Sequence, residues 1–167
     1  IKSVGHGTTC VCDLEAEYPV WLVLYELAQD VGHRLRKNEL MARGVQITVK
    51  DNDLDYRQYQ TPLPFPSQSP LEIAQAGFAL FRQHYFWDKP VRALTIRGIN
   101  LVSARQPVQL DMFCNAEARE RRRALDDCVD EIRRRFGNRA ICAAPLMGDL
   151  KMAQDKCETV MMSGLMY

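Results

Sequence analysis

Hydrophobic and polar residues change their spacing several times along the first hundred residues, and each change predicts a new element. Thr8 to Cys12 alternate and are rich in β-formers, which predicts a short strand. Apolar residues then recur at helical spacing from Pro19, a residue that the first turn of a helix tolerates. This pattern predicts a helix that ends near Asn38 and has one apolar stripe, formed by Val20, Leu24, Leu27, Val31 and Leu35.

Two strands, a second helix and a last strand are predicted next. Apolar residues alternate with polar ones over 45–50, a turn follows at 51–53, and a second strand covers about 54–63. Residues 69–72 read Ser-Pro-Leu-Glu, a capping box with proline at the first helical position, so a helix begins there and ends near residue 85 or 86. Residues 91–102 predict the last strand. The second helix is expected to point Ile73, Ala76, Leu80 and Phe81 inward.

The order β-α-β-β-α-β predicts an α+β fold with a four-stranded sheet. Two helices with one apolar stripe each can cover only one face of such a sheet. The other face is left to solvent or to a partner. By alternation it carries a polar and partly basic set, Gln46, Thr48, Lys50, Thr95 and Arg97.

A further helix is predicted over residues 117–135, beyond the sheet domain. Its apolar stripe is Leu125, Val129, Ile132 and Phe136, and Gly137-Asn138 ends it. Acids interrupt the arginines at 119 and 121–123, so these are expected to form a solvated face. We therefore divide the chain into a domain over 1–104, a linker over 105–114, and a helix and tail over 115–167. The role of 138–167 is left open: its Met-rich end is either a flexible tail or a strand that packs on another surface.

Composition narrows the class of protein. The chain has 167 residues, of which 47% are hydrophobic and 26% charged, as in an ordinary globular protein. With 22 basic and 21 acidic residues, it is not a protein that binds nucleic acid by bulk charge, so any such binding must depend on where charges lie. No apolar run approaches the length of a membrane span and no signal peptide is seen, so we expect a cytoplasmic protein with no membrane partner. Because the chain begins at Ile1, we expect it to be part of a longer protein.

No catalytic or metal site stands out. The six cysteines lack the spacing of a zinc site and are interpreted as buried, reduced thiols. Asp51, Asp53 and Asp55 have the spacing of a calcium loop, but Tyr56 and Pro62 occupy the positions that need glycine and glutamate, which favours a hairpin turn. The sequence around His6 offers no nucleophile or carboxylate to act with it.

A short segment in the linker carries the most specific pattern. Gln109-Leu110-Asp111-Met112-Phe113 resembles the Gln-Leu-x-Leu-Phe peptide with which bacterial replication and repair proteins bind the sliding clamp. Such peptides bind extended, with alternate side chains in pockets. Gln109 would hydrogen-bond at the pocket rim, and Leu110, Met112 and Phe113 would fill an apolar groove. The alternative is a linker whose Leu110 and Phe113 pack on the chain's own core.

The order of several motifs resembles the little finger domain of Y-family (DinB/UmuC) translesion DNA polymerases. Residues 2–9, Lys-Ser-Val-Gly-His-Gly-Thr-Thr, are similar to its opening signature. Matches follow at 35–36, 42–45, 63–64 and 91–94, and the helix at 125–137 resembles a tail found in some DinB-like proteins. The family's little fingers are usually more basic than this chain.

The resemblance implies a DNA-gripping domain that contacts phosphates through its open sheet face rather than reading bases. The implied DNA-binding residues are Lys2, Ser3, Gly5, His6, Gly7, Thr8, Thr9, Lys50, Arg57, Thr95 and Arg97. Gly5-His6-Gly7 is interpreted as a loop whose backbone approaches a phosphate. The implied partners are primer–template DNA, the bacterial sliding clamp, and the catalytic domains of the same polymerase. The family's catalytic carboxylates and Mg²⁺ lie in a palm domain, so we expect this chain to be non-catalytic and to hold no cofactor.

Two alternatives remain open. The same fold could be a protein-interaction module that docks polymerase domains or the clamp without touching DNA. It could also be a separate enzyme, although no nucleophile–base pair supports that interpretation.

Overall fold

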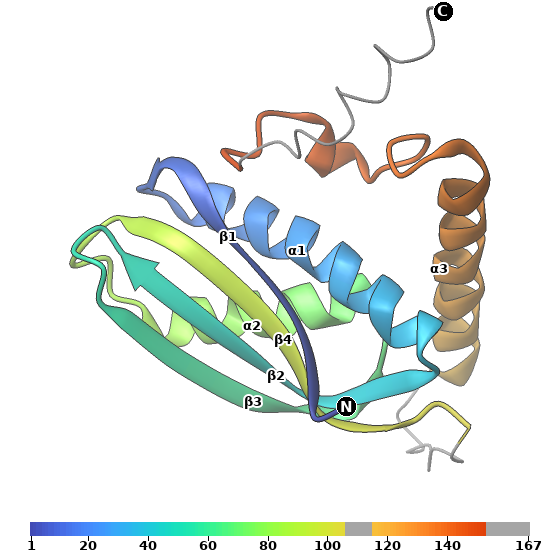
Figure 1. The fold of residues 1–167 in the computed structure, drawn as a ribbon. Coiled ribbons are helices and arrows are strands. Elements are labelled where there is room, and N and C mark those ends of the chain that lie inside the picture. Colours follow the sequence, from blue (N-terminus) through green and yellow to red (C-terminus); the bar gives the residue numbers. More distant parts are fainter. Residues whose placement is uncertain (106–114, 153–167) are drawn as a thin grey trace, which may run out of the picture.

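The computed structural model describes residues 1–105 and 115–152 and contains one four-stranded sheet, two helices packed on it, and a C-terminal extension (Figure 1). The elements in chain order are β1 (Ser3–Leu14), α1 (Glu17–Lys37), β2 (Leu40–Asp51), β3 (Tyr56–Ser67), α2 (Pro70–His84), β4 (Val91–Ser103), α3 (Ala116–Phe136) and the short 3₁₀ helix η1 (Ala144–Met147). The predicted α+β order is therefore confirmed.

The strands form an antiparallel sheet in the order β1-β4-β2-β3. The chain places β4 between β1 and β2, so the last strand completes the middle of the sheet. Residues 51–55 make the turn between β2 and β3, as expected, and the Asp51 carboxylate accepts hydrogen bonds from the backbone N–H groups of Asp53 and Asp55.

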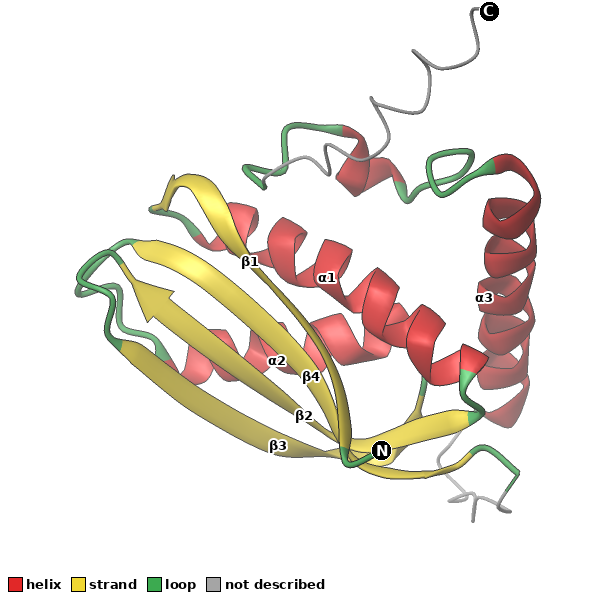
Figure 2. Cartoon of the chain, viewed as in Figure 1, coloured by secondary structure: helices red, strands yellow, loops and turns green. Residues whose placement is uncertain are grey.

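Both α1 and α2 cover the same face of the sheet (Figure 2). Their apolar stripes and the inward residues of the strands form one core, in which Leu24, Leu27, Ile47, Phe81 and Ile96 are fully buried. Gly32 lets α1 approach the start of α2 closely: a Cβ atom there would lie 2.7 Å from Cγ of Pro70 and 2.9 Å from the backbone oxygen of Gln68. No helix of the described residues lies on the other face of the sheet.

The first strand is longer than predicted. β1 begins at Ser3, so Gly5-His6-Gly7 is part of a strand and not a loop. The interpretation as a loop is wrong because pairing with β4 supplies the hydrogen bonds that hold two glycines extended. The second helix begins at Pro70, as predicted, but Ser69 makes no side-chain capping bond.

The extension packs differently from its prediction. α3 forms, with the Asn115 side chain accepting a hydrogen bond from Ala118 N–H at its start and Gly137 at its end. However, none of its residues is buried, and Leu125 and Phe136 of the expected apolar stripe are 58% and 73% exposed. The chain then returns along α1, buries Leu146, and pairs Met152 with Cys10 of β1.

The cysteine expectation is only partly right. Four of the six cysteines lie in the part of the chain that the structure describes; these four are free thiols, and Cys10 alone among them is buried. Cys114 and Cys157 lie outside the described residues. Within 1–105 and 115–152, no helix is long and apolar enough to cross a membrane.

Candidate nucleic-acid interface

The open face of the sheet is built from rungs in which each strand contributes one residue. Residues directly opposite each other on antiparallel strands point to the same face. One rung is Gly5, Arg97, Gln46 and Gln60, and the next is Gly7, Thr95, Thr48 and Gln58. The flanking rungs are Ser3, Ile99, Gly44 and Pro62 on one side and Thr9, Ala93, Lys50 and Tyr56 on the other.

The two glycines of β1 make room for side chains from β4. A Cβ atom at Gly5 would lie 2.3 Å from Cγ of Arg97, and one at Gly7 would lie 2.2 Å from Oγ1 of Thr95. Arg97 and Thr95 therefore lean over the edge strand. Together with Ser3 and His6, these residues line a shallow hollow on the surface.

Neutral hydrogen-bonding groups dominate this face. Gln46 Nε2 lies 3.4 Å from Oε1 of Gln60, and Gln58 Nε2 donates to Thr48 Oγ1 at 3.2 Å. Such weak pairs in water exchange readily with another acceptor. The face therefore offers amide and hydroxyl donors at modest cost.

The charged side chains on this face are positive. The four rungs hold two cations, Lys50 and Arg97, and no acid, and neither cation has a carboxylate partner within 4.0 Å among the residues that the structure describes. The acids of the β2–β3 turn are instead gathered around Lys89, whose Nζ lies 2.7 Å from Asp53 and 3.7 Å from both Asp51 and Asp55. The face is thus suited to a polyanion.

The strand register turns three of the expected DNA-binding residues toward the helix side of the sheet, although His6, on the edge strand, also borders the hollow. His6 is opposite Ile96, Thr8 is opposite Leu94, and Arg57 is opposite Val49, and these partners are all buried. The imidazole Nδ1 of His6 lies 3.0 Å from the Asp30 carboxylate on α1, and Arg57 Nη1 lies 4.0 Å from Asp88. The expectation that Arg57 lies on the open face with Lys50 and Arg97 is wrong, because the pairing of β3 with β2 turns Arg57 to the other side and alternation alone does not supply that pairing. His6 was expected in a loop and lies in β1 instead.

The structure brings the remaining expected residues together. Seven of them lie on the open face, and Lys2 lies exposed just before β1. Sequence reasoning missed the contribution of β3, which adds Tyr56, Gln58 and Gln60. Alternation over 56–60 indicates which residues share a face. It did not show which face points inward, because both faces of this edge strand are polar.

The expected clamp-binding residues Gln109, Leu110, Met112 and Phe113 lie outside the described residues. The chain is anchored on both sides of them. On one side Ala104 N–H donates to the Glu39 backbone oxygen at 2.8 Å, and Arg105 Nη2 lies 2.6 Å from the Glu39 carboxylate. On the other side Arg119 Nη2 donates to the Pro66 backbone oxygen at 3.0 Å, and its guanidinium lies 4.9 Å from the Phe65 ring centre.

The fold of this chain is similar to solved structures of a polymerase little finger domain and of Y-family DNA polymerases. A complex of a beta-clamp processivity factor with the little finger domain of PolIV matches with a TM-score of 0.51 and 15% identity, over 67% of this chain and 99% of that one. DinB from Sulfolobus solfataricus matches with a TM-score of 0.52 and 14% identity, over 60% of this chain and 29% of that one. The fold is therefore that of a Y-family little finger.

The sequence comparison agrees and is more specific. Residues 1–112 match the impB/mucB/samB family C-terminal domain, and the chain belongs to that family. The DNA polymerase IV of Acetivibrio thermocellus is 36% identical over 149 residues, which cover 89% of this chain and 37% of that protein. The DNA polymerase IV of Pelotomaculum thermopropionicum is 32% identical over 144 residues, covering 86% and 35%. The chain thus spans just over a third of the length of these relatives.

Proposed function

We propose that this chain is the DNA-gripping and clamp-tethering part of a bacterial translesion DNA polymerase that acts in the cytoplasm. The observation that carries the proposal is the open sheet face. Within the described part of the chain, this face has two cations without carboxylate partners, a row of amide and hydroxyl donors, and no acid. Such a face holds phosphates without reading base edges. A polymerase that crosses damaged template needs this kind of contact, because distorted DNA offers no constant sequence.

In this proposal, other domains of the polymerase carry out nucleotidyl transfer. The relatives are named DNA polymerase IV, and this chain matches only part of each of them. Mg²⁺ and the catalytic carboxylates would belong to the other domains of the polymerase, which are the third expected partner beside DNA and the clamp.

Salt-dependent binding tests the DNA contact. We expect the full chain to bind a primer–template duplex weakly, and the Lys50→Ala/Arg97→Ala variant to bind more weakly still. Each lost phosphate contact lowers the slope of log K against log salt by about 0.9. When binding is measured by fluorescence anisotropy at several salt concentrations, the slope of log K against log salt should therefore be smaller in magnitude by up to about 2 in the double variant.

Arg57→Ala is the matched control, because it removes a cation from the same sheet but from the helix side. It should leave the salt slope unchanged. Wild-type binding that the double variant does not weaken would contradict the proposal, and no salt-dependent binding at all would favour the protein-interaction module.

The clamp contact has its own test. Gln109→Ala/Phe113→Ala should abolish binding of the full chain to a bacterial sliding clamp in surface plasmon resonance, since peptides of this kind depend on the anchor amide and the aromatic residue. Equal binding by wild type and variant would show that the segment does not dock on the clamp.

A further inference from the structure

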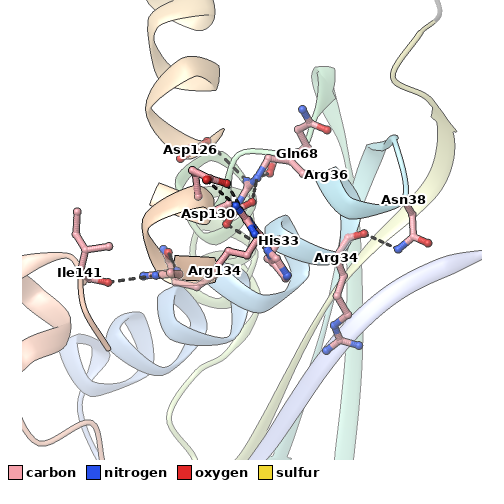
Figure 3. Close-up of polar contacts among 12 residues, drawn as sticks. His33, Arg34, Arg36, Asn38, Gln68, Asp126, Asp130, Arg134 and Ile141 are labelled. Carbon is pink, nitrogen blue, oxygen red and sulfur yellow. Dashed lines mark hydrogen bonds and ion pairs between the residues drawn. The ribbon is translucent and has the colours of Figure 1, made fainter. Parts of the chain in front are cut away.

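Polar side chains of α1 hold α3 against the sheet domain (Figure 3). Arg36 makes a forked contact with the Asp130 carboxylate, with its Nε at 2.6 Å and its Nη2 at 3.0 Å. His33 Nδ1 lies 3.2 Å from the same carboxylate. Gln29 Oε1, further toward the start of α1, accepts a hydrogen bond from Arg133 at 3.3 Å. One face of α3 is therefore used to hold the helix on α1.

The central pair of this contact is largely removed from water. The side chain of Arg36 is 8% exposed and that of Asp130 is 18% exposed. Nη1 of Arg36 also donates to the Gln68 backbone oxygen at 3.0 Å and lies 4.0 Å from the Asp126 carboxylate. Breaking such a pair leaves an uncompensated charge and costs far more than breaking an exposed ion pair. The contact therefore fixes which side of α3 faces the sheet domain.

The apolar stripe of α3 is turned away from this contact. Its residues, Leu125, Val129, Ile132 and Phe136, lie about a quarter turn from the face that contacts α1. Leu125 is 58% exposed and Phe136 is 73% exposed, and the two residues between them are only partly buried. The stripe is thus an apolar surface that the described part of the chain covers incompletely.

The spacing of the stripe fits a second helix. Its residues follow one another at intervals of four, three and four, which are the intervals of the a and d positions of a heptad repeat. Such a row forms a seam along which the side chains of a partner helix interlock. Arg122 occupies the preceding position of the same repeat, and no carboxylate lies within 4.0 Å of it among the described residues. The seam therefore carries a cation at one end.

The flank of the seam that is turned away from α1 is positive. In the heptad it holds Arg121, Cys128 and Arg135, and no acid. Arg121 pairs with Glu117, and Arg135 Nε lies 3.7 Å from the Glu131 carboxylate. The side chains of both pairs are more than half exposed, so these pairs contribute little and exchange readily in water. The two arginines are therefore available to carboxylates of a partner.

These charges decide which occupant the seam fits. Two copies of α3 would bring arginines together, because every charged residue on the seam and its open flank is an arginine. The carboxylate of Asp126, which could balance them, lies on the flank turned to α1. A lipid surface is disfavoured because helices that lie on membranes bury a broad apolar face, whereas this stripe is a single narrow row. A helix that carries carboxylates beside its own apolar row complements both the shape and the charge.

We propose that the apolar stripe of α3 is a docking site for an acidic amphipathic helix of another protein. The apolar side chains of that helix pack along the row from Leu125 to Phe136, and its carboxylates lie beside Arg121, Arg122 and Arg135. The site lies on the extension and not on the open face of the sheet, so it does not depend on the DNA contact proposed above. The chain then has a separate surface for a protein partner.

Two synthetic peptides test the chemistry of this site on the full chain. Both are helical over about three heptads with leucine at the a and d positions, and the flanking e and g positions hold glutamate in one and lysine in the other. Binding is measured by fluorescence anisotropy, and NMR chemical shifts of α3 amides show where the peptide binds. We expect the glutamate peptide to bind at least about tenfold more tightly than the lysine peptide, because like charges oppose the second complex.

Substitutions on the stripe should remove this binding. Leu125→Ala/Phe136→Ala should weaken binding of the glutamate peptide by at least about tenfold, because both side chains are exposed anchors of the seam. Tyr18→Ala is the control for lost apolar surface, since Tyr18 is 63% exposed on α1. Circular dichroism of each variant shows whether the helices are kept.

Two neighbouring arginines provide a second pair of variants. Arg122 lies on the seam, whereas Arg123 lies on the far side of α3. Arg122→Gln should weaken binding of the glutamate peptide about threefold, and Arg123→Gln should leave it unchanged. Glutamine is as good a helix former as arginine, so both variants keep α3 folded.

Equal affinity for the two peptides, or an affinity that Leu125→Ala/Phe136→Ala does not change, would overturn the proposal. Each of three other occupants would also overturn it. A second copy would appear as a dimer in sedimentation velocity that the double variant abolishes. A lipid surface would appear as binding to phosphatidylglycerol vesicles that the same variant abolishes. Residues 153–167 would be the occupant if only a chain ending at residue 152 bound the glutamate peptide.

Discussion

Arg97 and Thr95 lean over the edge strand only because glycine lies beneath them. The two glycines of β1 are placed one rung apart, each opposite one of these side chains. A larger residue at either position would push a polar group of the open face out of line. At the scale of single residues, the glycines of the opening motif therefore shape the surface of the sheet rather than a loop.

Gly7→Ala tests this role. Its Cβ atom would lie 2.2 Å from Thr95 Oγ1 and 3.2 Å from the Leu94 backbone oxygen, so the Thr95 side chain must move aside and the β4 backbone must give by a few tenths of an ångström. We expect the free energy of unfolding to fall by about 1–3 kcal/mol in urea denaturation. Gly148→Ala is the control, since a Cβ atom there meets nothing within 4 Å. Adding Thr95→Ala should recover part of the loss, and a Gly7→Ala variant as stable as wild type would show that the contact is not needed.

The two cysteines of β1 should differ sharply in reactivity. Burial, with the nearby Cys12 and Asp13, raises the pKa of the Cys10 thiol to about 11, although Arg92 opposes the shift. The thiolate is the reactive form, so at pH 8 Cys10 should react with iodoacetamide at least about 100-fold more slowly than the exposed Cys12. Its rate should rise about tenfold for each pH unit up to its pKa. Mass spectrometry of the labelled peptides measures both rates, and equal labelling would contradict the prediction.

At the scale of elements, periodicity predicted every strand and helix of the sheet domain. The apolar stripe of α1, with Val20, Leu24 and Leu27, is buried as expected because helical spacing reports directly which side faces a core. Periodicity did not predict which of Tyr56 and Arg57 faces the helices. That depends on how β3 pairs with β2, and the sequence of one strand does not give its pairing with another. The same holds for α3, whose contact face is polar and therefore invisible to a search for apolar spacing.

Gly32→Ala should destabilise α1 although alanine is the better helix former. In an exposed helix the change stabilises by about 1 kcal/mol. Here the added Cβ atom would meet the Pro70 ring and the Gln68 backbone oxygen, which cannot move without shifting the start of α2. We expect a net loss of about 1–3 kcal/mol in thermal or chemical unfolding. A gain in stability would show that α1 and α2 lie further apart than in this structure.

The docking of α3 should depend on pH in the acid range. Burial of Asp130 opposes its ionisation, but the hydrogen bonds and charge of Arg36, together with His33, outweigh burial and hold the pKa of Asp130 below its ordinary value. A carboxylate of this kind stabilises the docked state above its ordinary pKa of about 3.9, and the stabilisation is lost as the pH falls through its lowered pKa. Burial raises the pKa of Asp126, so that group takes up its proton first and favours docking as it does so.

NMR chemical shifts of α3 amides give the measurement. We expect α3 to stay docked down to about pH 4 and to be released below that, while the core signals persist. In Asp126→Asn the chemical-shift change caused by protonation of Asp126 should vanish, and the release of α3 at lower pH should remain. Release of wild-type α3 between pH 5 and 8 would contradict this assignment.

At the scale of the whole molecule, the sheet domain is complete without its extension. Within the described extension, α3 contains no buried residue, η1 adds Leu146 to the buried set, and Met152 packs partly buried against the core. We therefore expect a chain that ends at residue 105 to unfold cooperatively, with a Tm within about 5 °C of the full chain by circular dichroism. A truncated chain that loses cooperative unfolding would show that the extension is part of the core.

Both edges of the sheet are partly protected against pairing with strands of other molecules. β3 carries Pro62, Pro64 and Pro66, and proline has no N–H to offer a neighbouring strand. On β1, Val11 N–H is already bonded to the Lys151 backbone oxygen, and Cys10 is paired with Met152. Unpaired edges are where sheets of different molecules join and aggregate. Lys151 and Met152 therefore cover part of the β1 edge, and a chain trimmed before Lys151 should keep its fold yet precipitate at lower concentration.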